Sequence, residues 1–146
     1  MSTDLRLTGL AGVLRVDVPG RYRTAGTRSY LSDGRVVTWC PDPAVAHRCW
    51  AVDAEIAAQA VPAALARRTG LRDPDLFWRR WTAAEVACKL LDRPMICWLS
   101  RHGLSPEPIR AAGLALRTEV WNGLVVTIGS FAPGLPGEVS RPRGGA

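Results

Sequence analysis

Alternating apolar and polar residues mark the first third of the chain as β-rich. Three leucines within residues 5–10 precede a partly alternating stretch at residues 13–18, which a Pro-Gly pair ends. A period of two predicts strands with one buried face. Two further β-rich runs follow, at residues 36–39 and 49–52. We therefore expect residues 1–48 to form a reduced, β-rich N-terminal segment.

Helical periodicity dominates the middle of the chain. An Ala-rich stretch at residues 56–68 predicts one helix, with Pro62 at its start or at a break. Asp73 followed by Pro74 predicts the N-cap and first turn of a longer helix. A shorter helix is expected at residues 95–102. The core-facing stripe of the long helix recurs at steps of four and three, at Phe77, Trp81, Ala84, Cys88 and Leu91.

The sequence of residues 116–128 predicts an antiparallel hairpin. Asn122-Gly123 is a strong turn signal, and it separates apolar runs at residues 116–121 and 124–128. Beyond residue 131 the chain is rich in Gly and Pro, so residues 132–146 are expected to form a flexible tail. The fold class is therefore α+β, with a lobe at residues 49–131 in which a small antiparallel sheet packs on helices.

Composition excludes several classes of protein. The 146 residues are 47% hydrophobic and 22% charged, which suits one globular domain rather than a disordered chain. The longest uncharged stretch, residues 120–137, contains four Gly and two Pro and cannot form a membrane-spanning helix. No export signal is indicated, and we expect a cytoplasmic protein.

The formal net charge of +6 permits an acidic partner. The arginines are scattered, and no nucleic-acid-binding motif is recognised, so a basic nucleic-acid-binding module is kept only as a second alternative. The four cysteines form no C-x-x-C pair, and the two histidines lie at no usual zinc spacing. Reduced, partly buried thiols are therefore expected.

Two acidic residues follow the strand predicted at residues 49–52. Alternation would place Asp53 and Glu55 on one face, where their paired negative charge requires a cation or hydrogen-bond donors. Paired carboxylates at this spacing suit Mg²⁺. The alternative is a solvated strand end followed by a helix whose first turn favours acidic residues.

Glu85 and Lys89, the only lysine in the chain, share a face of the long helix. They could form an ordinary i,i+4 ion pair, worth about 0.3–0.5 kcal/mol. Residues 82–85 also fit a capping box, should one helix end near Trp81 and another begin. The tryptophans are more typical of core or interface residues than of stacking platforms.

Together these elements form a two-part motif. Residues 51–55 read A-V-D-A-E, and about thirty residues later residues 77–89 read F-W-R-R-W-T-A-A-E-V-A-C-K. The order, spacing and residue types resemble those of the 4′-phosphopantetheinyl transferase superfamily, including holo-acyl-carrier-protein synthases. Its members carry V-D-x-E followed by F-x-x-x-W-S/T-x-K-E-x-x-x-K. The resemblance covers roughly residues 49–130.

The resemblance implies Mg²⁺-dependent transfer of the 4′-phosphopantetheine arm from coenzyme A to a serine of an acyl or peptidyl carrier protein, in a pathway such as secondary metabolism. Asp53, Glu55 and Glu85 would hold magnesium on the pyrophosphate. Glu85 and Lys89 would be catalytic, and Lys89 and Arg80 would bind coenzyme A. The acidic carrier protein would dock on a chain of positive net charge.

Two positions depart from the family pattern. Ala84 stands where the family has a lysine before the helix glutamate, and Leu31-Ser32-Asp33 stands where larger members have L-S-H. These departures motivate an alternative: a diverged member that binds a carrier protein or a coenzyme A thioester and catalyses a different reaction or none. The short chain implies that half of a lobe is missing. Its absence would expose apolar surface on the remaining lobe, and a second copy of the chain would cover that surface, so we expect a homo-oligomer.

Overall fold

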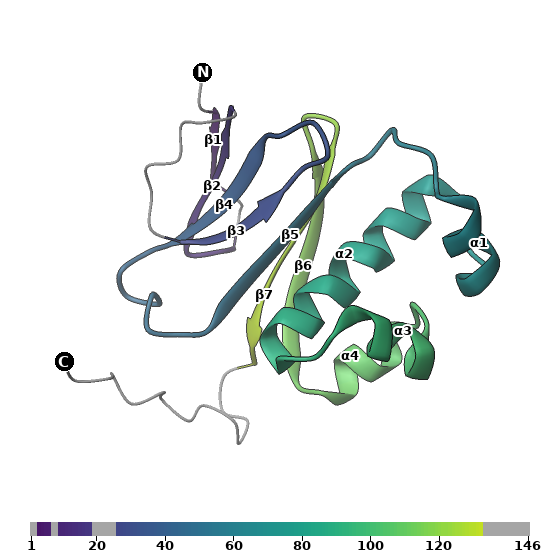
Figure 1. The fold of residues 1–146 in the computed structure, drawn as a ribbon. Coiled ribbons are helices and arrows are strands. Elements are labelled where there is room, and N and C mark those ends of the chain that lie inside the picture. Colours follow the sequence, from purple (N-terminus) through teal and green to yellow (C-terminus); the bar gives the residue numbers. More distant parts are fainter. Residues whose placement is uncertain (1–2, 7–8, 19–25, 133–146) are drawn as a thin grey trace.

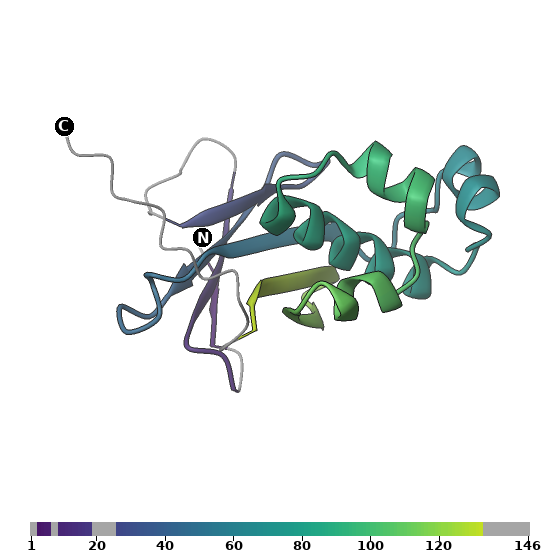
Figure 2. The same cartoon turned by 90° about the horizontal axis from the view of Figure 1, so that it is seen from below.

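The computed structural model describes residues 3–6, 9–18 and 26–132. Within these residues the fold is α+β, as predicted, with two small antiparallel sheets and four helices (Figure 1). The helices lie together on one side of the molecule, away from the strands nearest the N-terminus (Figures 1 and 2). The predicted tail at residues 133–146 lies outside the described residues.

The first sheet has four strands in the order β1-β2-β4-β3. Its pairings are all antiparallel, and the turn at residues 31–35 joins its third and fourth strands. This sheet confirms the β-rich character expected of the N-terminal segment. The strands are β1 (Thr3–Leu5), β2 (Gly12–Asp17), β3 (Thr27–Tyr30) and β4 (Val36–Pro41).

The second sheet has three strands in the order β5-β7-β6: β5 (Trp50–Ile56), β6 (Leu114–Trp121) and β7 (Leu124–Phe131). The predicted hairpin is confirmed, because Asn122 and Gly123 connect β6 to β7 with φ angles of 48° and 72°. Both residues therefore occupy the left-handed conformation that a type I′ turn requires. The turn fixes the register of the two strands.

The helices are α1 (Ala63–Thr69), α2 (Pro74–Leu91), α3 (Met95–His102) and α4 (Glu107–Ala111). The predicted start of α2 is confirmed, because the Asp73 side chain accepts a hydrogen bond from the Asp75 amide at 3.1 Å. Asp92 ends this helix with a positive φ of 52°. The capping-box interpretation of residues 82–85 is wrong, since α2 runs through them without interruption.

Two other expectations need correction. The helix predicted from residue 56 begins only at Ala63, because Ile56 still pairs with Leu124 in the second sheet. Tertiary pairing there outweighs the helical propensity of the Ala-rich sequence. The polar link after Gly103 also contains a short helix, α4, that sequence periodicity did not predict.

Two apolar clusters give the molecule three layers. Trp39, Val52 and Val126 belong to the cluster between the sheets, whereas Phe77 and Val125 belong to the cluster between the second sheet and the helices. Helix α2 crosses all three strands of the second sheet. Of the six tryptophans, Trp39, Trp78 and Trp98 are buried and the other three are half-buried.

Gly129 allows α2 to approach the sheet closely. A Cβ atom at this position would lie 2.8 Å from Val86 Cγ1 and 3.0 Å from Leu116 Cγ. We expect Gly129→Ala to lower the free energy of unfolding by about 1–3 kcal/mol through overpacking, measured by urea denaturation. Val86→Ala should relieve part of this loss in the double variant. Additive losses would show that Val86 is not the obstacle.

Across the described residues, no helix combines the length and apolarity needed to cross a bilayer.

Candidate active site

Strand β5 and helix α2 bring the two halves of the sequence motif together. Asp53 pairs across the sheet with Thr127, on the face covered by α2. Lys89, on the last turns of α2, donates a hydrogen bond from Nζ to Asp53 Oδ1 at 2.9 Å. The D-x-E and E-x-x-x-K segments therefore form one site, although about thirty residues separate them.

Asp53 is a buried carboxylate with an incomplete set of partners. It is 6% exposed, and its Oδ1 accepts hydrogen bonds from Lys89 and from Ser29 Oγ, the latter at 3.1 Å. Its Oδ2 is buried without a hydrogen-bond partner among the described residues. A buried carboxylate oxygen left in this state costs free energy, so it can accept an additional donor or cation.

Ser29 is a site residue that the sequence did not reveal. It lies on β3, in the other sheet, and its hydroxyl also accepts a hydrogen bond from the Ala54 amide at 3.0 Å. The packing of β3 beside β5 creates this contact. No local pattern around Ser29 signals it, because the contact depends on how the two sheets pack.

Lys89 reaches across to β5 rather than along its own helix. In addition to Asp53, its Nζ donates to the backbone oxygen of Val52 at 2.8 Å. The i,i+4 pair with Glu85 that the spacing allows is not formed. The ammonium group instead partly neutralises the buried Asp53 carboxylate.

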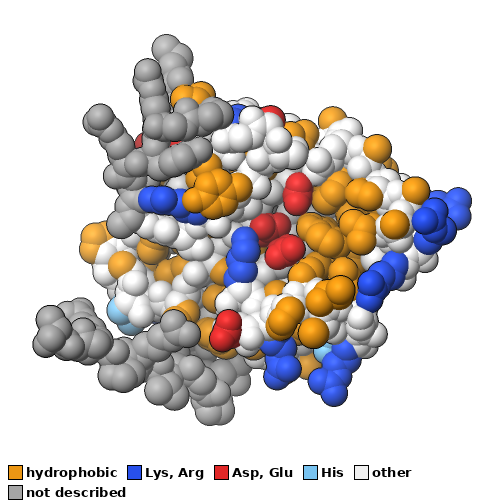
Figure 3. All heavy atoms as spheres, in the orientation of Figure 1, with side chains coloured by type: hydrophobic (Ala, Val, Ile, Leu, Met, Phe, Trp, Pro, Cys, Tyr) orange, Lys and Arg blue, Asp and Glu red, His pale blue; other side chains and the backbone are white. Residues whose placement is uncertain are grey.

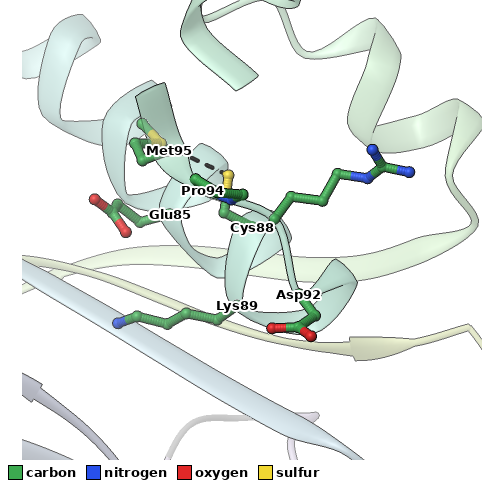
Figure 4. A pocket seen from close by; sticks show the side chains of 7 residues that line it. Glu85, Cys88, Lys89, Asp92, Pro94 and Met95 are labelled. Atoms are coloured by element: carbon green, nitrogen blue, oxygen red, sulfur yellow. Dashed lines mark hydrogen bonds between the residues drawn. The ribbon is translucent and has the colours of Figure 1, made fainter. Parts of the chain in front are cut away.

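Glu55 and Glu85 complete the acidic cluster, defined here as Asp53, Glu55 and Glu85. Glu55 accepts a hydrogen bond from Gln59 Nε2 at 2.7 Å. Glu85 and Lys89 line a cavity of about 380 Å³ and extend toward the same side of α2 (Figure 4). Acidic side chains gather beside a basic one near the junction of β5 and α2, next to a broad apolar surface (Figure 3).

Burial and neighbouring charges shift the pKa values of the three carboxyls. Burial raises the pKa of Asp53, against the opposing effect of Lys89. Burial also raises the pKa values of Glu55 and Glu85, and the neighbouring negative charges raise them further. One ammonium group therefore does not compensate three acids, and the cluster would gain from an additional cation.

These shifts predict an unusual dependence of stability on pH. Because the folded-state pKa values are raised, the folded protein binds protons more tightly than the unfolded chain does. The associated stability is fully present below the ordinary carboxyl pKa of about 4 and is lost as the pH rises through the raised values. In urea denaturation with a chelator, the stability of the wild type relative to Glu85→Gln should decrease from pH 4 to 7. If the difference in the free energy of unfolding between wild type and Glu85→Gln stays constant across this pH range, the pKa of Glu85 is not raised.

The donor set suits a magnesium ion, although its three members do not converge on one point. Within residues 3–6, 9–18 and 26–132, no group of three or more His, Cys, Asp or Glu is arranged to hold a metal ion. Asp53 nevertheless offers a buried oxygen without a partner, and hard carboxylate oxygens are the ligands that Mg²⁺ prefers. Lys89 and Ser29 occupy the other oxygen of this carboxylate, Asp53 Oδ1.

The threonine of the motif has a structural role. Thr82 Oγ1 lies 2.8 Å from Thr127 Oγ1, which lies 2.7 Å from Thr118 Oγ1. Thr82 and Thr127 are fully buried. This chain of hydroxyls joins α2 to β7 and β6 beside Asp53, and it holds the helix in register with the acidic strand.

The remaining motif positions lie away from the cluster. The positive charge of Arg80 is felt by Glu107 of α4. The pKa of Glu107 is lowered mainly by a hydrogen bond from the Ser105 hydroxyl, and to a lesser extent by the charges of Arg110 and Arg80. Ala84 is 1% exposed and packs in the core cluster with the helices, so it provides no contact to a phosphate group. Asp33 pairs with Arg35 at 2.8 Å in the β3–β4 turn.

The four cysteines are free thiols, of which Cys88 is buried, Cys40 half-buried, and Cys49 and Cys97 exposed. Cys88, in the wall of the cavity, donates to Met95 Sδ at 3.7 Å (Figure 4). Burial, together with the charge of Glu85, raises the pKa of this thiol to about 11. Cys88 is therefore protonated at neutral pH and is not a nucleophile.

Comparisons with protein-family models, curated proteins and solved structures found no match for this chain.

Proposed function

We propose that the protein transfers the 4′-phosphopantetheine arm of coenzyme A to a serine of an acidic carrier protein, with Mg²⁺ as cofactor. The observation that carries this proposal is the meeting of the two motif halves. Lys89 of α2 contacts Asp53 of β5 at 2.9 Å, and the second oxygen of Asp53 remains buried without a partner. The resemblance of residues 49–131 to the phosphopantetheinyl transferase lobe supports the same conclusion.

Asp53, Glu55 and Glu85 would hold the magnesium ion. Bound there, the ion would supply positive charge for the pyrophosphate oxygens of coenzyme A. Burial raises the pKa values of all three acids, and the charge of neighbouring acids raises those of Glu55 and Glu85 further, an excess of negative charge that a bound cation would offset. The cavity beside Glu85 and Lys89 is large enough for phosphate groups.

Glu85 is the proposed general base. As the serine oxygen forms its bond to the β-phosphorus, the bond from that phosphorus to the bridging pyrophosphate oxygen breaks, and 3′,5′-adenosine bisphosphate leaves. Glu85 accepts the serine proton, and a raised pKa makes this carboxylate a better proton acceptor. Lys89 offsets the negative charge that develops on the leaving group.

The direct test is incubation of the full chain with a carrier protein, coenzyme A and Mg²⁺. Mass spectrometry should show the gain of one phosphopantetheine arm on the carrier protein. Chelation of the metal should stop the reaction, and re-addition of Mg²⁺ should restore it. A carrier protein whose acceptor serine is replaced by alanine is the matched control. No mass gain with several acidic carrier proteins would refute the proposal.

The Lys89–Asp53 contact also favours a second candidate, binding of a carrier protein or coenzyme A thioester without transfer. The ammonium group already partly neutralises the carboxylate that would hold the metal, and Ala84 stands where the family pattern has a lysine that contacts phosphate. Coenzyme A with Mg²⁺ would then raise the melting temperature without any mass gain on a carrier protein. Stabilisation together with transfer supports the first candidate.

Homo-oligomerisation stays a prediction. Its clearest support is on α3, where Ile96 is 65% exposed. Light scattering at micromolar concentration should give a mass above that of one chain, and a monomeric mass would contradict the prediction.

A further inference from the structure

A second cavity of about 360 Å³ lies between α3 and α4. This volume falls in the range of small-molecule sites in proteins. Its walls combine basic, aromatic and small apolar side chains and contain no acidic residue. The lining residues are Arg93, Cys97, Trp98, Arg101, His102, Pro108, Ala111 and Ala112.

The two arginines of this cavity have no internal counter-charge. Neither Arg93 nor Arg101 forms an ion pair or a side-chain hydrogen bond with any of the residues that the structure describes. Both are exposed and can turn toward a ligand. Two guanidinium groups beside an imidazole offer the planar, multiple donors that match the oxygens of a phosphate group.

Trp98 gives the cavity a fixed wall with an unused donor. It is 5% exposed, and its ring lies 4.7 Å from that of His102, centroid to centroid. Its indole Nε1 is buried and has no hydrogen-bond partner among the described residues. A buried N–H without an acceptor is uncommon, because it loses its bond to water and gains nothing in return.

Helix electrostatics explain where these cations lie, but they supply no counter-charge. Arg101 and His102 lie in the last turn of α3, where cations stabilise the helix end. Arg93 follows the C-cap of α2, Asp92, and its amide donates to the Cys88 carbonyl, so it lies at a second helix C-terminus. Arg93 also lines the cavity of Glu85 and Lys89, so the two cavities meet at this residue.

We propose that the α3/α4 cavity binds a phosphate monoester group, held by Arg93 and Arg101 against the wall formed by Trp98 and His102. A phosphate dianion takes hydrogen bonds from both guanidinium groups. The remaining volume accommodates part of the organic group that carries the phosphate. This binding site is separate from the acidic cluster and requires no metal.

The test is titration of the ¹⁵N-labelled full chain with inorganic phosphate at constant ionic strength. The indole N–H resonance of Trp98, assigned with Trp98→Phe, should shift and saturate. Arg93→Gln/Arg101→Gln should weaken phosphate binding by at least about tenfold. The matched control is Arg67→Gln/Arg72→Gln, which removes the same charge from exposed positions outside the cavity. It should change the affinity by less than about twofold.

Comparison of ligands identifies the source of the phosphate. If it belongs to coenzyme A, removal of the 3′-phosphate weakens binding to the wild type but not to Arg93→Gln/Arg101→Gln. If the ligand is a free phosphorylated metabolite, both forms of coenzyme A bind equally and inorganic phosphate still saturates the site. Absence of saturation, or equal losses in the two double variants, overturns the proposal. Phosphopantetheine transfer is measured separately, so failure of either proposal leaves the other intact.

Discussion

Glu85→Gln should reduce the rate of phosphopantetheine transfer by about 10²- to 10⁴-fold, the usual contribution of a general base. The substitution keeps the size of the side chain and removes both its charge and its ability to accept the serine proton. Glu85 has no hydrogen bond or ion pair with the described part of the chain. The fold should therefore survive, and the loss should appear in the rate of carrier-protein modification.

Glu119→Gln is the matched control for this prediction. Glu119 lies on β6 and pairs with Arg117 at 2.7 Å, in a partly exposed position away from the acidic cluster. Surface changes of this kind usually alter the free energy of unfolding by less than about 0.5 kcal/mol. The control should retain wild-type transfer. Equal rates in wild type and Glu85→Gln would contradict both proposed roles of Glu85, as general base and as magnesium ligand.

Elements with strong local signals could be predicted from the sequence. The start of α2 depends on Asp73 and Pro74, and the β6–β7 hairpin depends on Asn122 and Gly123. In each case neighbouring residues determine the backbone conformation, so the information is local. The acidic motif is also local to β5 and α2, and the resemblance that assigns its residues to one site did not predict the contact between Asp53 and Lys89.

Features that depend on tertiary packing could not be predicted. Residue 56 belongs to β5 because it pairs with Leu124, which is 68 positions away and leaves no trace in the local pattern. Ser29 reaches Asp53 only because β3 packs beside β5. The direction of Lys89 is a third example, because a buried carboxylate on β5 attracts it more strongly than Glu85 does on its own helix.

The motif combines structural and chemical roles that the sequence alone does not separate. Thr82 and Ala84 are buried and hold α2 against the sheet and the other helices. Glu85 and Lys89 lie at the edge of the same helix and border a cavity. A helix with one face fixed by packing can position the other face accurately, which a site built from two distant segments requires.

Lys89→Met should lower the free energy of unfolding by about 1–3 kcal/mol, because it leaves the Asp53 carboxylate buried with Ser29 as its remaining side-chain donor. The loss is smaller than for a fully buried pair, since the Lys89 side chain is 36% exposed and solvent screens its charge. Urea denaturation at neutral pH with a chelator measures the change. Asp53→Asn in the same chain should restore most of the lost stability, because no buried charge then remains unpaired.

Magnesium separates a structural lysine from one that occupies a metal site. In Lys89→Met the ion meets no competing ammonium at Asp53, so Mg²⁺ should raise the melting temperature more than in the wild type. Arg79→Met is the control, since it breaks an exposed pair with Asp75 at 3.2 Å and should change neither stability nor the response to metal. If Mg²⁺ raises the melting temperature of neither Lys89→Met nor Arg79→Met, the acidic cluster does not bind the ion, and the Asp53–Lys89 pair serves the fold alone.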